Sequence, residues 1–195
     1  LRAAGFIRPA VACQVFWHKG RTIYLVVHGD DFLAIAKAQD LAWLDSVLTD
    51  RLVIKLGPRV GGPRHGGQRS GDYLKRLISW SEDGFEWIPD KSHIETVVTT
   101  LGIEKVTARQ VTPGSKSVGK GLREAADLLG HAEMKQYQSM AAACLYIAGD
   151  RPDIAYAVTV LMRGMAAPIV THQVQLHRLA TYLYKFTEAV WRYAY

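Results

Sequence analysis

The first part of the chain alternates between short apolar runs and turn residues. Residues 22–27 and 32–36 are rich in β-branched and aromatic side chains, which is typical of buried strands. Between them lies His28-Gly29-Asp30-Asp31, a turn sequence that predicts a β-hairpin with the aspartates at its tip. A preceding strand is expected to start within 14–17 and to end at the turn at 19–21.

Helical spacing of apolar residues predicts five helices. The first is expected at 39–52, with Asp40 as its N-cap, and the second at 91–101, where Gly102 ends it. The other three are predicted near the end of the chain, at 132–148, 152–166 and 171–186. Because strands come first and helices last, the pattern predicts an α+β fold with a helical second domain.

A second hairpin is predicted at 73–89. Asp83-Gly84 is a strong two-residue turn signal, and a turn at these residues places Trp80 opposite Trp87. Such a pair stabilises a hairpin or offers a stacking surface to a base, and the structural role is favoured.

Positive charge gathers in two stretches of this chain of 195 residues, whose net charge is +6. Residues 51–81 contain seven Lys or Arg and one acid, and residues 105–123 contain five basic residues and no acid. Within the first stretch, 57–71 has six glycines, so we expect a flexible basic loop there. Clustered basic residues favour a polyanionic partner such as nucleic acid, although an ordinary solvated surface is the alternative.

Apolar residues make up 49% of the chain, which is enough for a packed core and excludes global disorder. Cys13 and Cys144 lie far apart without metal-ligand spacing, which favours a reducing compartment, cytoplasm or nucleus. No apolar run approaches the roughly 18 residues that a membrane span needs. The chain starts without Met and stops within aromatic, strand-like residues, which predicts a piece of a longer protein.

As a set, these motifs resemble the reverse transcriptase domain of copia-type retrotransposons. The Asp30-Asp31 hairpin stands where that family carries Tyr-x-Asp-Asp, and residues 73–87 are similar to its Tyr-Phe-Leu-Gly-Ile hairpin, which lies near the primer strand. Thr112-Pro113 resembles the family's Thr-Pro before its helical block. The most specific matches lie in that block: Tyr137-Gln138-Ser139-Met140, Leu145-Tyr146, Arg151-Pro152-Asp153-Ile154, Pro168, His172 and Arg178 to Leu183.

The resemblance implies a partial polymerase palm over 1–113, an antiparallel sheet with the Asp-Asp hairpin, then a linker at 114–131 and a helical thumb or connection block over 132–195. It implies Asp30 and Asp31 as catalytic residues and ligands of Mg²⁺, with Mn²⁺ as an alternative. The implied reaction is template-primed addition of dNTP by two metal ions, with an RNA template and a DNA primer as partners. We expect nucleic-acid contacts from His28, Arg59, Arg64, Arg69, Lys75, Arg76 and Trp80.

Two departures from the family pattern limit this expectation. His28-Gly29 replaces Tyr-x. The family's first catalytic Asp and its fingers subdomain are expected upstream of Leu1. The family's ribonuclease H domain would follow Tyr195. We therefore expect a polymerase fragment that is inactive alone. The alternatives are a non-catalytic nucleic-acid-binding remnant of a retroelement and an interaction module with decayed sites.

Three polar residues of the helical block that match the family pattern fit structural roles better than functional ones. Arg151 and Asp153 flank the Pro that begins a predicted helix, where an acidic residue stabilises the helix N-terminus. His172 lies at the start of the last predicted helix, and a capping role is favoured over metal binding because no second His lies at ligand spacing.

Overall fold

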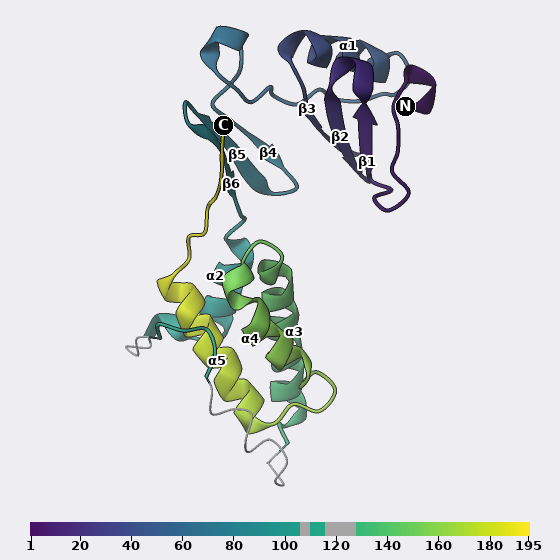
Figure 1. Ribbon diagram of the computed structural model, residues 1–195. Coiled ribbons are helices and arrows are strands. Elements are labelled where there is room, and N and C mark those ends of the chain that lie inside the picture. Colours follow the sequence, from purple (N-terminus) through teal and green to yellow (C-terminus); the bar gives the residue numbers. More distant parts are fainter. Residues whose placement is uncertain (106–109, 116–127) are drawn as a thin grey trace. The chain divides into compact units, whose positions relative to one another are not determined.

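The computed structural model describes residues 1–105, 110–115 and 128–195. The chain divides into two compact units (Figure 1). The strand unit comprises Leu1–Ile88 and Trp191–Tyr195, and the helical unit comprises Pro89–Val190. Both sheets are antiparallel, and the described residues form five α-helices, so the predicted α+β class is confirmed.

The first sheet of the strand unit has the order β1-β2-β3, formed by β1 (Val15–His18), β2 (Ile23–His28) and β3 (Asp31–Ile35). Helix α1 (Ala38–Thr49) packs on one face of this sheet, because alternate strand residues and the apolar stripe of the helix are buried together. The buried residues of this core are Phe6, Ile23, Leu25, Leu44 and Leu48.

Asp40 does not cap α1, contrary to the prediction. It lies in the first turn of the helix, behind Lys37, and is buried. Its carboxylate accepts a hydrogen bond of 3.2 Å from Nη1 of Arg21, and the guanidinium of Arg21 lies 4.1 Å from the ring centroid of Trp43. Asp40 thus pairs with an arginine 19 residues away in the sequence, a contact that local capping rules do not detect.

The second sheet has the order β4-β5-β6-β7. Its strands are β4 (Ser70–Tyr73), β5 (Arg76–Ser81), β6 (Gly84–Ile88) and β7 (Trp191–Ala194). The predicted second hairpin corresponds to β5 and β6. Two further strands extend it, since β4 pairs with β5 and β7 pairs with β6.

The predicted register of the second hairpin is wrong. Trp80 pairs with Phe85, and Trp87 pairs with Ile78. Gly84 belongs to β6 rather than to the turn, since it pairs with Ser81 and with Ala194. Its φ is +149°, and a Cβ atom at this position would overlap the backbone of Tyr193. The close approach of β7 thus requires a glycine here. The turn is formed by Glu82 and Asp83, one residue earlier than predicted.

The basic loop at 57–71 is more ordered than its composition predicts. Val60 and Gln68 form a β-bridge, and a 3-10 turn at Pro63–His65 lies between them. The Gly61 N–H donates to the Gln68 carbonyl at 3.0 Å, and the Gln68 N–H donates to the Arg59 carbonyl at 2.7 Å. These backbone bonds close the loop before β4 begins.

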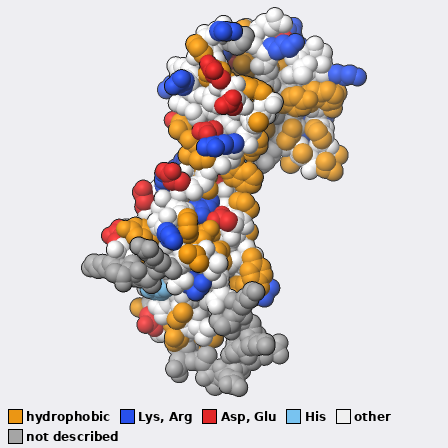
Figure 2. Space-filling view, turned by 60° about the vertical axis from the view of Figure 1, so that its left-hand side comes forward, with side chains coloured by type: hydrophobic (Ala, Val, Ile, Leu, Met, Phe, Trp, Pro, Cys, Tyr) orange, Lys and Arg blue, Asp and Glu red, His pale blue; other side chains and the backbone are white. Residues whose placement is uncertain are grey.

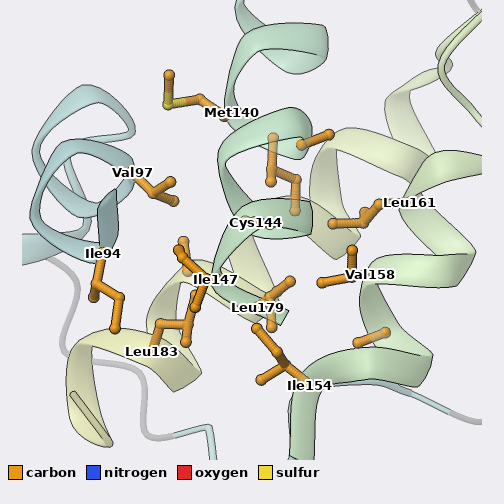
Figure 3. Packing of buried hydrophobic residues seen from close by; sticks show 14 of the residues in the cluster. Ile94, Val97, Met140, Cys144, Ile147, Ile154, Val158, Leu161, Leu179 and Leu183 are labelled. Atoms are coloured by element: carbon orange, nitrogen blue, oxygen red, sulfur yellow. The ribbon is translucent and has the colours of Figure 1, made fainter. Parts of the chain in front are cut away.

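The helical unit contains α2 (Ser92–Thr100), α3 (His131–Ala148), α4 (Ala155–Met162) and α5 (Val170–Lys185). Helix α2 packs against α3 and α5, so its contacts group it with the later helices rather than with the preceding strands. Figure 3 shows side chains from all four helices converging on one core. They include Ile94 and Val97 of α2, Ile147 of α3, Val158 of α4 and Leu183 of α5.

The predicted helices of this unit are found with small shifts at their ends. Residues Pro152–Ile154 form a 3-10 turn before α4, and most of the predicted linker at 114–131 lies outside the described residues. The capping role of His172 is confirmed, because its Nδ1 accepts the Ile169 N–H at 3.2 Å. Both cysteines are free, and burial raises the pKa of the Cys144 thiol to about 12. Of the helices described, none has the length and hydropathy required to cross a membrane.

Candidate metal-binding turn and nucleic-acid interface

Asp30 and Asp31 lie at the turn between β2 and β3. His28 pairs with Asp31, so Gly29 and Asp30 form the two-residue turn itself. Gly29 has a φ of +61°, and glycine is preferred at the first position of such turns because it adopts positive φ without steric cost. His28, Asp30 and Asp31 are all exposed, so both carboxylates are open to solvent and to ligands.

The two aspartates occupy different backbone positions. Asp31 is the first residue of β3 and shares its sheet face with Leu33 and Ile35, while Phe32 and Ala34 point to the core under α1. Asp30 lies in the turn, outside this alternation. The pair therefore presents one carboxylate from the turn and one from the uncovered face of the sheet.

The chemistry of the turn suits a hard cation, because carboxylate oxygens are the ligands that Mg²⁺ prefers in proteins. The ligand set is small, however. Within the described ranges, no group of three or more His, Cys, Asp or Glu side chains lies close enough together to hold a metal ion. Asp30 and Asp31 could thus supply part of a metal site and would need a further ligand from elsewhere.

Tyr73, at the end of β4, lies within electrostatic reach of Asp31. Burial raises the pKa of Tyr73, and the negative charge of Asp31 raises it further. The hydroxyl of Tyr73 is buried and has no hydrogen-bond partner among the described residues. Tyr73 is thus a residue near Asp31 that the sequence analysis did not assign to the site.

Lys75 lies at the tip of the β4–β5 hairpin, where Leu74 and Lys75 form a two-residue turn. Both have positive φ, +48° and +62°, in a turn type that usually takes Asn-Gly or Asp-Gly. Lys75 is exposed, whereas Arg76 is half-buried and donates from Nη1 to the Leu74 carbonyl at 2.7 Å. Of the two expected phosphate contacts in this hairpin, Lys75 is the more accessible.

The three loop arginines differ in their surroundings. Arg59 donates from Nη2 to the Asp45 carboxylate of α1 at 2.6 Å, so it anchors the loop to the first helix. Arg64 and Arg69 are exposed. Arg69 lies directly beside Trp80, whose backbone N–H donates to the Arg69 carbonyl at 2.7 Å. Among the basic residues expected to contact phosphates, Arg64, Arg69 and Lys75 are therefore the best candidates.

Trp80 is half-buried and held in place by two neighbours. Its Nε1 donates to the Tyr195 hydroxyl at 2.6 Å. Its ring lies against Gly62, where an added Cβ would come within 3.0 Å of the indole. Sequence reasoning identified Trp80 but missed Phe85, Tyr193 and Tyr195 beside it. Their signal was present as alternation, since Trp191, Tyr193 and Tyr195 are spaced by two residues, as on one face of a strand.

An open pocket of about 520 Å³ lies elsewhere in the strand unit, between the β1–β2 connection and the start of α1. Arg21, Lys37 and Asp40 are among its lining residues, and none of the expected site residues borders it. Comparison with known proteins adds no assignment for either region: no family model matches the chain, and neither a curated protein nor a solved structure matches it.

Proposed function

We propose that this chain is part of an RNA-directed DNA polymerase of the copia retrotransposon type, comprising the end of a polymerase palm and a helical thumb or connection block. The observation that carries the proposal is the exposed Asp30-Asp31 turn of the first hairpin. It is followed in the chain by the β4–β5 hairpin, with Lys75 at its tip, and by the Arg151-Pro152-Asp153-Ile154 entry to α4, in the order that the family carries.

In this proposal Asp30 and Asp31 would hold Mg²⁺ or Mn²⁺ through their exposed carboxylates. A bound ion of this kind would neutralise phosphate charge and activate the attacking hydroxyl. The exposed Lys75 and Arg69 would donate to phosphate oxygens and hold the primer strand. Two carboxylates fit such an ion only in part, so the third ligand would come from the Asp motif that precedes this region in the family.

A non-catalytic remnant that binds nucleic acid is the second candidate. It is favoured by the small ligand set of the turn and by His28-Gly29 at the place of the family's Tyr-x. The reading frame upstream separates the two. An in-frame segment that carries the missing Asp motif supports the enzyme, and a stop codon or frameshift supports the remnant.

Primer extension tests the proposal directly. The chain alone, given an RNA template, an annealed DNA primer, dNTPs and Mg²⁺, should make no product. When the segment encoded upstream is supplied in frame, extension should appear and Asp30→Asn should abolish it. The matched control is Glu82→Gln, in the exposed two-residue turn between β5 and β6, which should leave extension unchanged. Synthesis that Asp30→Asn does not reduce would disprove the metal assignment, and primer-template binding without extension would favour the remnant.

A further inference from the structure

One face of the β4–β7 sheet is aromatic. Cross-strand partners share a face, and so do strand residues two positions apart. The register therefore places Trp80, Phe85 and Tyr193 in one row across β5, β6 and β7. The next row on the same face is Ile78, Trp87 and Trp191, and the Tyr73 ring lies 6.4 Å from that of Trp87. We call this surface the aromatic face; its members are Tyr73, Trp80, Phe85, Trp87, Trp191, Tyr193 and Tyr195.

The central rings of the aromatic face are fixed before any ligand binds. The Trp80 Nε1–H donates a hydrogen bond to the Tyr195 hydroxyl. The Tyr195 ring packs edge-on against the Phe85 ring, with ring centroids 6.0 Å apart. Gly62 lies against the six-membered ring of Trp80. A surface whose side chains are already ordered loses little entropy on binding, which favours affinity.

The outer rings remain accessible. Tyr193 is 58% exposed and Trp191 is 40% exposed, and Phe85 and Trp80, on the neighbouring strands β6 and β5, are half-buried. Figure 2 shows that both apolar and basic side chains reach the surface of the strand unit. A planar ligand could therefore lie against the Tyr193 ring without displacing the core of the sheet.

The two faces of this sheet carry different charged side chains. Arg69 and Arg76 fall on the aromatic face, because they are in register with Trp80 and Tyr73. The carboxylates of the strands fall on the opposite face: Asp72 pairs with Leu77, and Glu86 accepts a hydrogen bond of 3.0 Å from Nε of Arg192. Among the strand positions of β4–β7, the aromatic face thus carries rings and cations without a carboxylate, which complements bases joined by phosphates.

We propose that the aromatic face binds single-stranded nucleic acid by stacking unpaired bases on Tyr193 and its neighbours, with Arg69 next to the phosphates. Unpaired bases are required because the faces of paired bases are already covered by their neighbours in a duplex. Stacking of this kind tolerates any base sequence. The inference rests on the proposed function in one respect only, that the partner is nucleic acid. It needs neither the Asp30-Asp31 turn nor a metal ion.

Fluorescence anisotropy with the full chain tests this inference in EDTA. The probes are a labelled oligo-dT of about 12 nucleotides and an abasic oligomer of equal length and charge. The chain should bind oligo-dT about tenfold more tightly than the abasic oligomer. Tyr193→Ala should remove this preference, and Tyr193→Phe should keep it because the ring remains. Tyr156→Ala removes a tyrosine that is 76% exposed on α4 and serves as the matched control, with wild-type affinity expected.

Equal affinity for the two probes, or an unchanged preference in Tyr193→Ala, would overturn the inference. A preference that appears only with Mg²⁺ would also overturn it, because binding would then belong to the Asp30-Asp31 turn. A preference that persists in EDTA supports the aromatic face even if primer extension fails, so the two proposals can fail separately.

Discussion

Arg151 and Asp153 form a two-point ion pair at the entry to α4. Nε and Nη2 of Arg151 donate to the two carboxylate oxygens of Asp153 at 2.9 and 2.7 Å. The third guanidinium nitrogen donates to the Phe186 carbonyl at 2.7 Å, just beyond α5. Only 3% of the Arg151 side chain is exposed. The pair joins the start of one helix to the end of another, and the hydrogen bond from Arg151 lowers the pKa of Asp153.

Asp153→Asn should destabilise the helical unit, because it leaves the buried guanidinium of Arg151 without its counter-charge. The expected loss is about 3 kcal/mol, the low end of the range for breaking a buried pair, since Asp153 is partly exposed. Urea unfolding followed by far-UV circular dichroism measures it. All five tryptophans lie in the strand unit, so tryptophan fluorescence should be unaffected. Glu188→Gln breaks the exposed Lys91–Glu188 pair and should leave the transition unchanged; equal losses in both variants would refute the account.

The helical unit should lose stability as pH falls below about 6.5. Burial lowers the pKa of His172 and of His177, so the folded state binds fewer protons than the unfolded state, whose histidines titrate near 6.5. The contribution is thus fully present above pH 6.5 and is lost as pH falls through the lowered pKa. Protonation also removes the Nδ1 acceptor of the Ile169 N–H.

His172→Gln separates the contribution of His172 from that of His177. The variant should be less stable at pH 7.5 and should lose less stability than the wild type between pH 7 and 5. The helical transition in urea, measured at each pH, reports both quantities. A pH profile parallel to that of the wild type would show that His172 does not contribute to the dependence.

The Leu74-Lys75 turn stores backbone strain that can be relieved. Both residues adopt positive φ, which costs non-glycine residues of order 1 kcal/mol or more each. Replacing the pair with Asn-Gly should stabilise the strand unit by about 1 kcal/mol, because the entropy cost of glycine offsets part of the gain. Tryptophan fluorescence during urea unfolding measures it. The control is Asp83→Gly in the β5–β6 turn, where φ is not positive; a similar gain there would contradict the strain explanation.

The elements that were predicted well are those whose signal is local. The β2–β3 hairpin follows from two apolar runs around a Gly-Asp turn, and α2 follows from Ile94, Val97 and Val98 at helical spacing. Strand β4, with the sequence Ser-Gly-Asp-Tyr, has no apolar alternation and was missed. The predicted register of Trp80 was wrong by one residue, because Gly84 lies in β6 against the backbone of β7, a segment more than 100 residues later that no local pattern reveals.

Prediction of the candidate site from the sequence was limited in the same way. Sequence reasoning placed Asp30 and Asp31 at a predicted turn, whereas it selected Lys75 for its charge and did not predict the turn at Leu74-Lys75; the structure has all three exposed at hairpin turns. It could not detect the ion pair between Asp45 and Arg59, or that Tyr193 lies in the same cross-strand row as Trp80, because these residues come together only when the chain folds. Pairing between distant segments, rather than local pattern, sets the composition of this surface.

The central claim is that the Asp30-Asp31 turn holds a divalent cation, and paramagnetic broadening by Mn²⁺ tests it most directly. In a ¹⁵N-labelled sample of the full chain, substoichiometric Mn²⁺ should broaden the amide signals of residues 28–32 first, and Asp31→Asn should remove the effect. The Glu82-Asp83 turn is the internal control, because it also carries two adjacent exposed acids in a hairpin turn. Selective broadening at residues 28–32 is the predicted result. Equal broadening at both turns, or broadening that survives Asp31→Asn, would contradict the claim.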